Sequence, residues 1–225
     1  MKRIIKGQEP EALRQWKWEN DQIPENLKYD HANWPKQAVK RQMLAEQGHL
    51  CAYTMQTIPT EDYCHIEHVV PRSQPDQPPQ LHSDYNNLLA CFPGDRLPQR
   101  NGKYRYGAQF KGGKHIDENN FVSPLREDVE RRFQYVVDGS VTTQAGDIAA
   151  ESSTRILGLN HPQLIELRKA AIDERVLDAG FSGQEAEVLA VEVMSANSEG
   201  RFPEFCLAIS HAARWYASRM RDAPY

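Results

Sequence analysis

Few cysteines, no membrane-length apolar run and no excess of positive charge mark this chain of 225 residues. Four cysteines in a chain of this length do not indicate a disulfide scaffold, so we expect reduced thiols. The N-terminus lacks the apolar core of a signal peptide, and no apolar run approaches the length of a membrane span, which favours a cytoplasmic protein. The net charge of −4 gives no global signature of nucleic-acid binding. A mean hydropathy of −0.71 predicts a modest core with much wetted surface.

Metal-binding and proton-handling side chains are concentrated in one stretch, Cys64-His65-Ile66-Glu67-His68-Val69-Val70-Pro71-Arg72-Ser73. The alternation of a strand places His65 and Glu67 on one face and His68 on the other. Pro71 cannot donate to a β-ladder, so the strand ends near it, and a bend there can turn His68 toward the pocket that Glu67 faces. A carboxylate able to bind a hard cation then lies beside an imidazole able to take a proton from water. The alternative is a half-buried strand that happens to carry two histidines.

The periodicity of the remaining chain predicts a mixed α+β fold. One β-hairpin is expected from strands near 50–56 and 63–69, and a second over 129–141, turned at Asp138-Gly139-Ser140. Ser182 with Glu185 forms a capping-box pattern. Helices are predicted over residues 10–18, 35–47, 153–157, 162–177, 182–195 and 203–220.

A wider pattern surrounds this stretch. Cys51 precedes it, and Asn87-Leu88, Cys91 and Lys111-Gly112 follow it. This order resembles the HNH, or ββα-metal, nuclease motif. Over about residues 1–175 the chain resembles one HNH family, the nuclease subunit (PtuB) of Septu and retron-associated anti-phage defence systems. The segments that carry this longer resemblance are 1–7, 121–125, 132–135, 138–139, 156–160 and 167–172.

The resemblance implies three parts of the chain and a role for each side chain of the motif. The parts are an N-terminal arm with a helix (1–47), an HNH nuclease core (48–125), and a β-hairpin with a helical C-terminal region (126–225). His68 corresponds to the general base, and Glu67 to the acidic ligand of one Mg²⁺ or Mn²⁺ ion. His65 is either a further ligand or an orienting group.

The other positions of the motif are less closely matched. Its Asn is Asn87 or Asn86, and Asn87 is expected to fix the loop that carries the catalytic His through side-chain–backbone hydrogen bonds. The last metal ligand is Asp95, the chemically better choice, or Gln109. Lys111 is expected to contact phosphate.

A basic stretch follows the motif. From Arg96 to Ile116 there are six Lys or Arg and no Asp or Glu, as phosphate contact requires. The alternative is a solvated basic loop. The residues predicted to bind nucleic acid are Arg72, Arg100, Lys103, Arg105, Lys111 and Lys114.

Members of this family typically add a structural zinc held by two pairs of cysteines. Here Cys51 and Cys91 remain, but Thr54 stands where the second cysteine of the first pair would be, and the region of the partner of Cys91 offers tyrosines. Two thiolates do not close a tetrahedral site, even with Cys64 nearby, so a structural Zn²⁺ is not expected.

Two functions from different classes fit these residues. The intact His65, Glu67, His68 and Pro71 favour a metal-dependent endonuclease that hydrolyses phosphodiester bonds of DNA, or of RNA such as tRNA, as the effector of an anti-phage system. The broken zinc pattern and the unmatched third ligand favour a degenerate HNH domain that binds nucleic acid or acts as an adaptor without cutting. A zinc-finger-like DNA reader is weakly supported, because no pair of cysteines has finger spacing.

The resemblance also implies partners: an ABC-type ATPase subunit (PtuA-like), and in retron versions a reverse transcriptase with its RNA–DNA product (msDNA). We expect the segments outside the HNH core to dock the ATPase, because aromatic residues are enriched at interface cores. The alternative is that these aromatic residues close their own helical core. They are Phe181, Phe202, Phe205, Trp215 and Tyr216.

Overall fold

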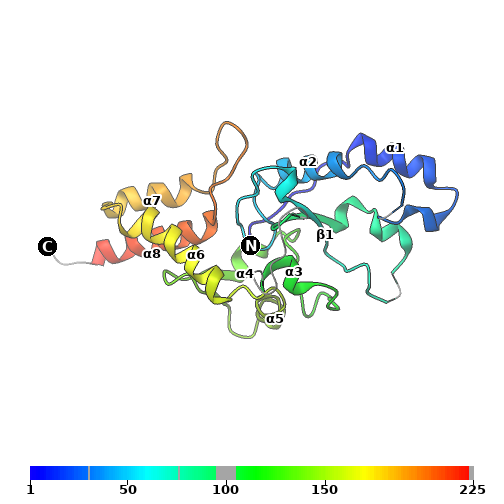
Figure 1. Cartoon of the computed structure of the whole chain (residues 1–225). Helices are drawn as coiled ribbons and strands as arrows, with labels where there is room; N and C mark the ends of the chain where they lie inside the picture. The colour runs from blue at the N-terminus through cyan, green and yellow to red at the C-terminus, as the bar shows by residue number, and fades with distance from the viewer. Residues whose placement is uncertain (30, 76, 95–104, 223–225) are drawn as a thin grey trace.

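Eight α-helices and two small antiparallel sheets form an α+β fold in the described part of the chain. This computed structural model describes residues 1–29, 31–75, 77–94 and 105–222. The helices are α1 (Glu11–Asn20), α2 (Lys36–Glu46), α3 (Gly107–Lys111), α4 (Val129–Arg132), α5 (Ile148–Ile156), α6 (Pro162–Ile172), α7 (Gly183–Glu192) and α8 (Cys206–Asp222). The strands are β1 (His65–His68), β2 (Leu88–Cys91), β3 (Phe133–Tyr135) and β4 (Val141–Thr143). The molecule is elongated, with α6, α7 and α8 toward one end and α1 toward the other (Figure 1).

The two N-terminal helices form where the sequence predicted them. Trp16 of α1 is 4% exposed and packs inward, whereas Trp18 is 70% exposed and anchors nothing in the described residues. α2 buries three apolar side chains at helical spacing: Val39, Met43 and Leu44. Gly48 follows α2 with a φ of +55°, and a Cβ there would lie 2.2 Å from the ring of Phe202. Only glycine fits at this helix end, because both the backbone angle and the contact exclude a side chain.

The first predicted hairpin is wrong in its pairing. The sequence predicted that residues 50–56 pair with residues 63–69, but β1 pairs with β2. The register is antiparallel, with His68 opposite Leu88. The reason is that the residues after Leu50 hydrogen-bond to one another in a turn, so their backbone groups are not available to pair with β1.

That closed segment is a tight turn between α2 and β1. The N–H of Cys51 donates to the carbonyl of Gln56 at 2.8 Å, and the N–H of Met55 donates back to the carbonyl of Cys51 at 2.9 Å. Tyr53, at the tip, is fully buried and meets Phe121 edge to face, with ring centroids 5.9 Å apart. The turn therefore presents the Tyr53 side chain to the core and a sulfur to β2.

A short helix follows the two strands. The N–H of Gly107, the first residue of α3, donates to the carbonyl of Leu157 at 2.6 Å, which fixes α3 against the C-terminal part of the chain. α3 ends with Lys111, whose side chain points into the protein and reaches β1. The described order is therefore strand, strand, helix, with the helix supplying a cation to the first strand.

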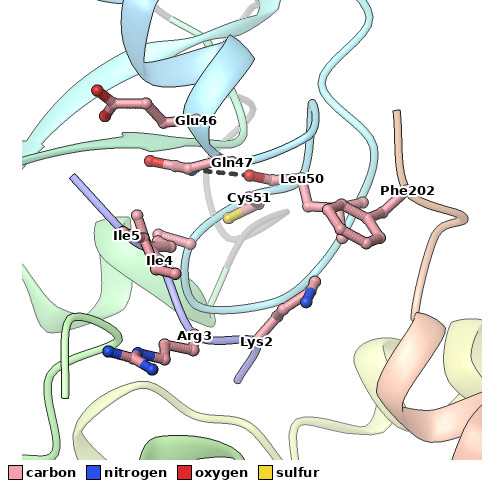
Figure 2. A pocket seen from close by; sticks show the side chains of 10 residues that line it. Lys2, Arg3, Ile4, Ile5, Glu46, Gln47, Leu50, Cys51 and Phe202 are labelled. Carbon is pink, nitrogen blue, oxygen red and sulfur yellow. Dashed lines mark hydrogen bonds between the residues drawn. The ribbon is translucent and has the colours of Figure 1, made fainter. Parts of the chain in front are cut away.

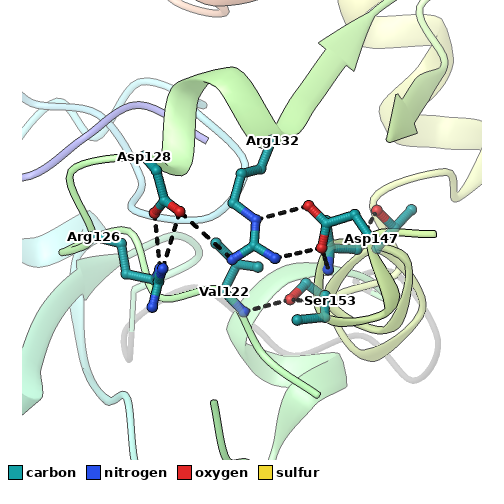
Figure 3. A network of polar contacts seen from close by, with 9 residues as sticks. Val122, Arg126, Asp128, Arg132, Asp147 and Ser153 are labelled. Carbon is teal, nitrogen blue, oxygen red and sulfur yellow. Dashed lines mark hydrogen bonds and ion pairs between the residues drawn. The ribbon is translucent and has the colours of Figure 1, made fainter. Parts of the chain in front are cut away.

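A polar network ties the segment after α3 to α5 (Figure 3). Arg132 donates from Nε to Asp147 at 2.8 Å, forms a second bond to the same carboxylate, and approaches Asp128 at 3.9 Å. Because this fork is planar and bidentate, it fixes the orientation of α4 as well as its distance from α5. The buried hydroxyl of Ser153 accepts the N–H of Val122 at 2.7 Å alongside it.

The C-terminal third follows the predicted elements closely. β3 and β4 form the second hairpin, although residues 129–132 are helical rather than extended. Both halves of the predicted capping box, Ser182 and Glu185, are present at the start of α7. α7 packs along α8. In the described ranges, no helix is both long and apolar enough to cross a bilayer.

The C-terminal aromatic residues do not form one exposed surface. Phe205 is 2% exposed, Phe202 packs against the core, and the hydroxyl of Tyr216 donates to the carbonyl of Phe181 at 3.0 Å. Trp215 is 43% exposed. Most of this aromatic area therefore closes the core of the chain itself.

Candidate active site

Glu67 of β1 is the centre of the candidate site, and a cation already contacts it. The ammonium of Lys111 donates to Oε1 of Glu67 at 2.6 Å and to the carbonyl of His68 at 3.0 Å. The side chain of Lys111 is 0% exposed and that of Glu67 is 12% exposed. Burial raises the pKa of Glu67, while the charge of Lys111 acts in the opposite direction. The hydroxyl of Tyr53 approaches the same oxygen at 3.5 Å.

His65 faces the other oxygen of this carboxylate. Its Nε2 lies 3.9 Å from Oε2 of Glu67, as expected for residues that alternate onto one face of a strand. Its Nδ1–H donates to the carbonyl of Pro93 at 2.6 Å, so Nε2 is the nitrogen with the free lone pair when the ring is neutral. Metal-ligating histidines are commonly oriented in this way: the ring nitrogen that does not bind the metal donates a hydrogen bond to a backbone carbonyl.

His68 is held as a neutral imidazole with a defined tautomer. Its Nε2–H donates to the carbonyl of His82 at 3.0 Å, which leaves Nδ1 as the basic nitrogen. Burial lowers the pKa of His68 to about 4; the bond to His82 opposes this, and the charges of Arg72 and Lys111 add to it. The ring of Tyr29 meets His68 edge-on, with centroids 5.1 Å apart. At neutral pH the imidazole is therefore unprotonated, and its burial makes it a weaker base than an exposed histidine.

Asn87 fixes the segment that follows His68. Its Oδ1 accepts the N–H of Val70 at 2.8 Å, and its Nδ2 donates to the carbonyls of Val70 and Leu81, both at 3.2 Å. Its own carbonyl accepts the N–H of Val69 at 2.9 Å. These are the side-chain–backbone contacts that the sequence predicted for this position. Asn86 is exposed, and its N–H donates to Oδ1 of Asp84 at 3.0 Å.

A cavity of about 390 Å³ opens beside these residues. Its lining consists of Ile66, Glu67, His68, Pro71, Arg72, Ser73, Gly112 and Gly113. Glu67 and His68 thus both line one space. A Cβ at Gly113 would lie 2.6 Å from Oγ of Ser73, so the loops that wall the cavity approach closely only because this residue is glycine.

Of the residues predicted to bind phosphate, those in the described part of the chain outside α3 are exposed. Arg72 is exposed at the cavity, 5.1 Å from the ring centroid of Tyr29. Arg105 is exposed, and Lys114 is exposed beside Phe110. Asp95, Arg100 and Lys103 lie outside the described residues.

Lys111 corrects the expectation of an open phosphate-binding lysine. Its side chain has no surface exposure, and its ammonium is bound to Glu67, because a carboxylate buried without a partner charge would be strongly destabilising. Gln109, the alternative last ligand, is half-buried on α3.

Sequence reasoning missed two aromatic contributors. Tyr29 comes from the loop between α1 and α2 and packs on Trp34, with centroids 4.7 Å apart, before it meets His68. Tyr53 reaches Glu67 from the tight turn. The bulky Tyr53 between Ala52 and Met55 was a usable signal, since such apolar side chains need a core to bury them. Nothing local marks Tyr29.

The cysteines of the predicted broken zinc pattern are buried and reduced. Sγ of Cys51 accepts the N–H of Phe92, the residue after Cys91, at 3.4 Å, and Cys64 donates to the carbonyl of His65 at 3.4 Å. Among the described residues, no group of three or more His, Cys, Asp or Glu side chains is arranged to hold a metal ion.

Comparison with known proteins adds no relative. No protein-family model matches the chain, and no curated protein matches it in sequence.

Proposed function

We propose that this protein is a metal-dependent HNH-type endonuclease that hydrolyses phosphodiester bonds of nucleic acid, with β1, β2 and α3 as its ββα-metal core. One observation carries the proposal. His65 Nε2 and Glu67 Oε2 lie 3.9 Å apart on one face of β1, and the neutral imidazole of His68 shares a cavity with Glu67. A ligand pair beside a base is the minimum that hydrolysis assisted by one ion requires.

The donor pair lies close enough to share a divalent cation after a small adjustment. Two neighbouring ligands of an octahedral ion, each at about 2.1 Å, lie about 3.0 Å apart. The 3.9 Å between His65 Nε2 and Glu67 Oε2 is longer than this, so the two side chains would move closer together when an ion binds. Mg²⁺ commonly keeps several waters and uses one or two carboxylates, so two protein ligands suit Mg²⁺ or Mn²⁺ better than a closed zinc site. Asp95 remains the proposed third ligand.

The side chains of the chain divide the work. His68 accepts a proton from the attacking water at Nδ1, and its bond to the His82 carbonyl keeps the lone pair of the neutral ring on that nitrogen. Asn87 holds the backbone at Val70 and so fixes the direction of the imidazole. Arg72 contacts the phosphate from the cavity rim. When bound, the divalent ion supplies charge stabilisation at the phosphate and at the leaving oxygen.

A second function is favoured by one contact. The Lys111 ammonium already neutralises Glu67 inside the protein, as in a site that no longer needs a metal. The alternative is therefore a degenerate HNH domain that binds nucleic acid or serves as an adaptor without cutting. The two functions differ in a direct way, because only the nuclease needs His68 as a base.

The wider role that we propose is effector of an anti-phage system of the Septu or retron type. Its partners would be an ABC-type ATPase subunit and, in a retron setting, a reverse transcriptase with its msDNA. The apolar side chains exposed on α7 and α8 support a docking surface in the C-terminal region. These are Val188, Val191, Trp215 and Met220.

A cleavage assay tests the proposal. Full-length protein is incubated with labelled double-stranded DNA, single-stranded DNA and tRNA, with Mn²⁺, Mg²⁺ or chelator. We expect metal-dependent cutting of at least one substrate and a loss of about 10²- to 10⁴-fold in His68→Ala. His211→Asn, which replaces a half-buried histidine on α8, is the matched control and should cut normally. Cutting by His68→Ala at the wild-type rate contradicts the assignment, and tight binding without cutting under any metal favours the adaptor.

A further inference from the structure

The strongest feature outside the candidate site is a pair of thiols from two different segments. Cys51 begins the tight turn after α2, and Cys91 ends β2. The N–H of Ala52 donates to the carbonyl of Ala90 at 3.1 Å, and the N–H of Phe92 donates to Sγ of Cys51 at 3.4 Å. These two hydrogen bonds join the residues that flank the pair, so they place Cys51 and Cys91 next to each other.

A cavity reaches one sulfur of this pair. The cavity has a volume of about 170 Å³ and lies between the N-terminal segment and the end of α2. Figure 2 shows the sulfur of Cys51 directed toward Ile4, with Gln47 beside it. The Cys51 side chain lines this cavity although the residue is only 1% exposed, so a molecule the size of water or peroxide has room next to the sulfur.

The two thiols differ in pKa. Burial alone would raise the pKa of Cys51, but hydrogen bonds from Cys91, from the N–H of Phe92 and from Thr54 outweigh it and lower the pKa to about 6. Burial raises the pKa of Cys91 far above its ordinary value, and the neighbouring Cys51 adds to this. The Cys51 thiol therefore loses its proton more readily than the Cys91 thiol, and the thiolate is the reactive form of cysteine.

We propose that Cys51 and Cys91 form a reversible redox pair, in which Cys51 is the site of peroxide attack and Cys91 closes a disulfide. The Cys51 thiolate attacks one oxygen of hydrogen peroxide, the O–O bond breaks, hydroxide leaves, and Cys51 becomes a sulfenic acid. The Cys91 sulfur then attacks the Cys51 sulfur, the S–O bond breaks, and water leaves with the Cys91 proton. Two thiols are oxidised and one peroxide is reduced to two waters. External thiol reverses the step, because low-pKa Cys51 is a good leaving group.

The proposal does not depend on nuclease activity, but it does bear on the candidate site. Tyr53 lies two residues after Cys51 in the same turn, and its hydroxyl approaches Glu67 at 3.5 Å. A disulfide holds its two sulfurs about 2.05 Å apart, so its formation would link this turn covalently to β2. Tyr53 is the residue of the turn through which the link reaches Glu67.

Peptide mapping of the full-length protein tests the redox pair. The native protein is treated with limiting hydrogen peroxide, free thiols are blocked with iodoacetamide, and the protein is then denatured, digested and analysed by mass spectrometry. We expect a cross-link between the peptides that contain Cys51 and Cys91, a mass loss of two hydrogen atoms, and full reversal by dithiothreitol. Cys51→Ser and Cys91→Ser should each remove the cross-link. Cys206→Ser is the matched control, because burial raises the pKa of Cys206 to about 11, and it should leave the cross-link intact.

Three results would overturn the proposal. One is a cross-link that uses Cys64 or Cys206 in place of either partner. Another is oxidation of Cys51 to stable sulfenic or sulfinic acid with Cys91 left free. The third is peroxide reactivity of Cys51 no greater than that of Cys206 in the native wild-type protein, a comparison that needs no variant to fold.

Discussion

Removal of the Lys111 ammonium should destabilise this protein more than removal of any exposed lysine. Its side chain is fully buried, and its Nζ satisfies both Oε1 of Glu67 and the carbonyl of His68. In Lys111→Met the apolar stem is largely kept, while Glu67 loses its only cationic hydrogen-bond donor among the described residues. Breaking a buried ion pair by deleting one partner costs about 3–5 kcal/mol. The loss should be near the lower end of this range, since Glu67 can bind a proton and so avoid a buried, unpaired negative charge.

The protonation of Glu67 makes the stability of Lys111→Met depend on pH. Without the ammonium, the pKa of Glu67 rises further above its ordinary value, so the folded variant holds a proton that the unfolded chain releases. Its stability is then fully present below the ordinary pKa of a glutamate and is lost as the pH rises through the folded pKa. The deficit of Lys111→Met relative to wild type should therefore be larger at pH 8 than at pH 5.

Urea unfolding followed by tryptophan fluorescence measures this deficit, since the chain contains four tryptophans. Lys114→Met is the matched control: Lys114 is exposed, and its loss should change the free energy of unfolding by less than about 0.5 kcal/mol. The double variant Glu67→Gln/Lys111→Met should recover most of the loss, because a buried pair replaced on both sides is often neutral. If Lys111→Met costs no more than Lys114→Met, Glu67 does not depend on this lysine and the account of the site is wrong.

Two further predictions concern single hydrogen-bonding side chains. Asn87→Ala leaves the N–H of Val70 without its acceptor, so it should cost about 1–3 kcal/mol of unfolding free energy in a urea titration; an equally stable variant would refute the structural role. His211 accepts the N–H of Tyr135 at 3.1 Å, and burial, with the charge of Arg214, lowers its pKa to about 4. The unfolded chain binds the proton more tightly, so stability is present above about pH 6.5 and is lost as the pH falls toward 4. His211→Asn keeps an acceptor near the same place without a titrating group, and it should flatten that acid-side loss in unfolding curves between pH 7 and pH 4; an unchanged slope would assign the loss to other groups.

The helices could be predicted because their signals are local. Val39, Met43 and Leu44 repeat at helical spacing, and both members of the Ser182–Glu185 box lie within one turn of each other. Helix propensity, hydrophobic periodicity and capping all depend on residues a few positions apart, so the folded structure keeps the helices that they predict. The same holds for the second hairpin, whose turn at Gly139 requires a positive φ of 85°.

The pairing of β1 could not be predicted in the same way. Strand partners are chosen by contacts distant in sequence, and the nearer candidate at 50–56 was lost to the turn that Cys51 closes with Gln56. β2 lies beyond a proline-rich loop and matches β1 as a short, wholly buried strand, which alternation alone does not identify. The local pattern therefore gave the position of β1 and its side-chain faces, and only tertiary structure gave its neighbour.

The candidate site shows the same division at the level of single atoms. The pattern H-x-E-H in a strand requires that His65 and Glu67 share a face, and the 3.9 Å between Nε2 and Oε2 follows from this. The contacts of the other atoms of Glu67 and His68 come from segments outside this pattern. Oε1 of Glu67 accepts a hydrogen bond from a lysine of α3, and Nε2 of His68 donates to a carbonyl in the loop before β2. These two distant contacts determine whether Glu67 is available to a metal and which nitrogen of His68 is basic, so the chemistry of the motif depends on the packing around it as much as on its own residues.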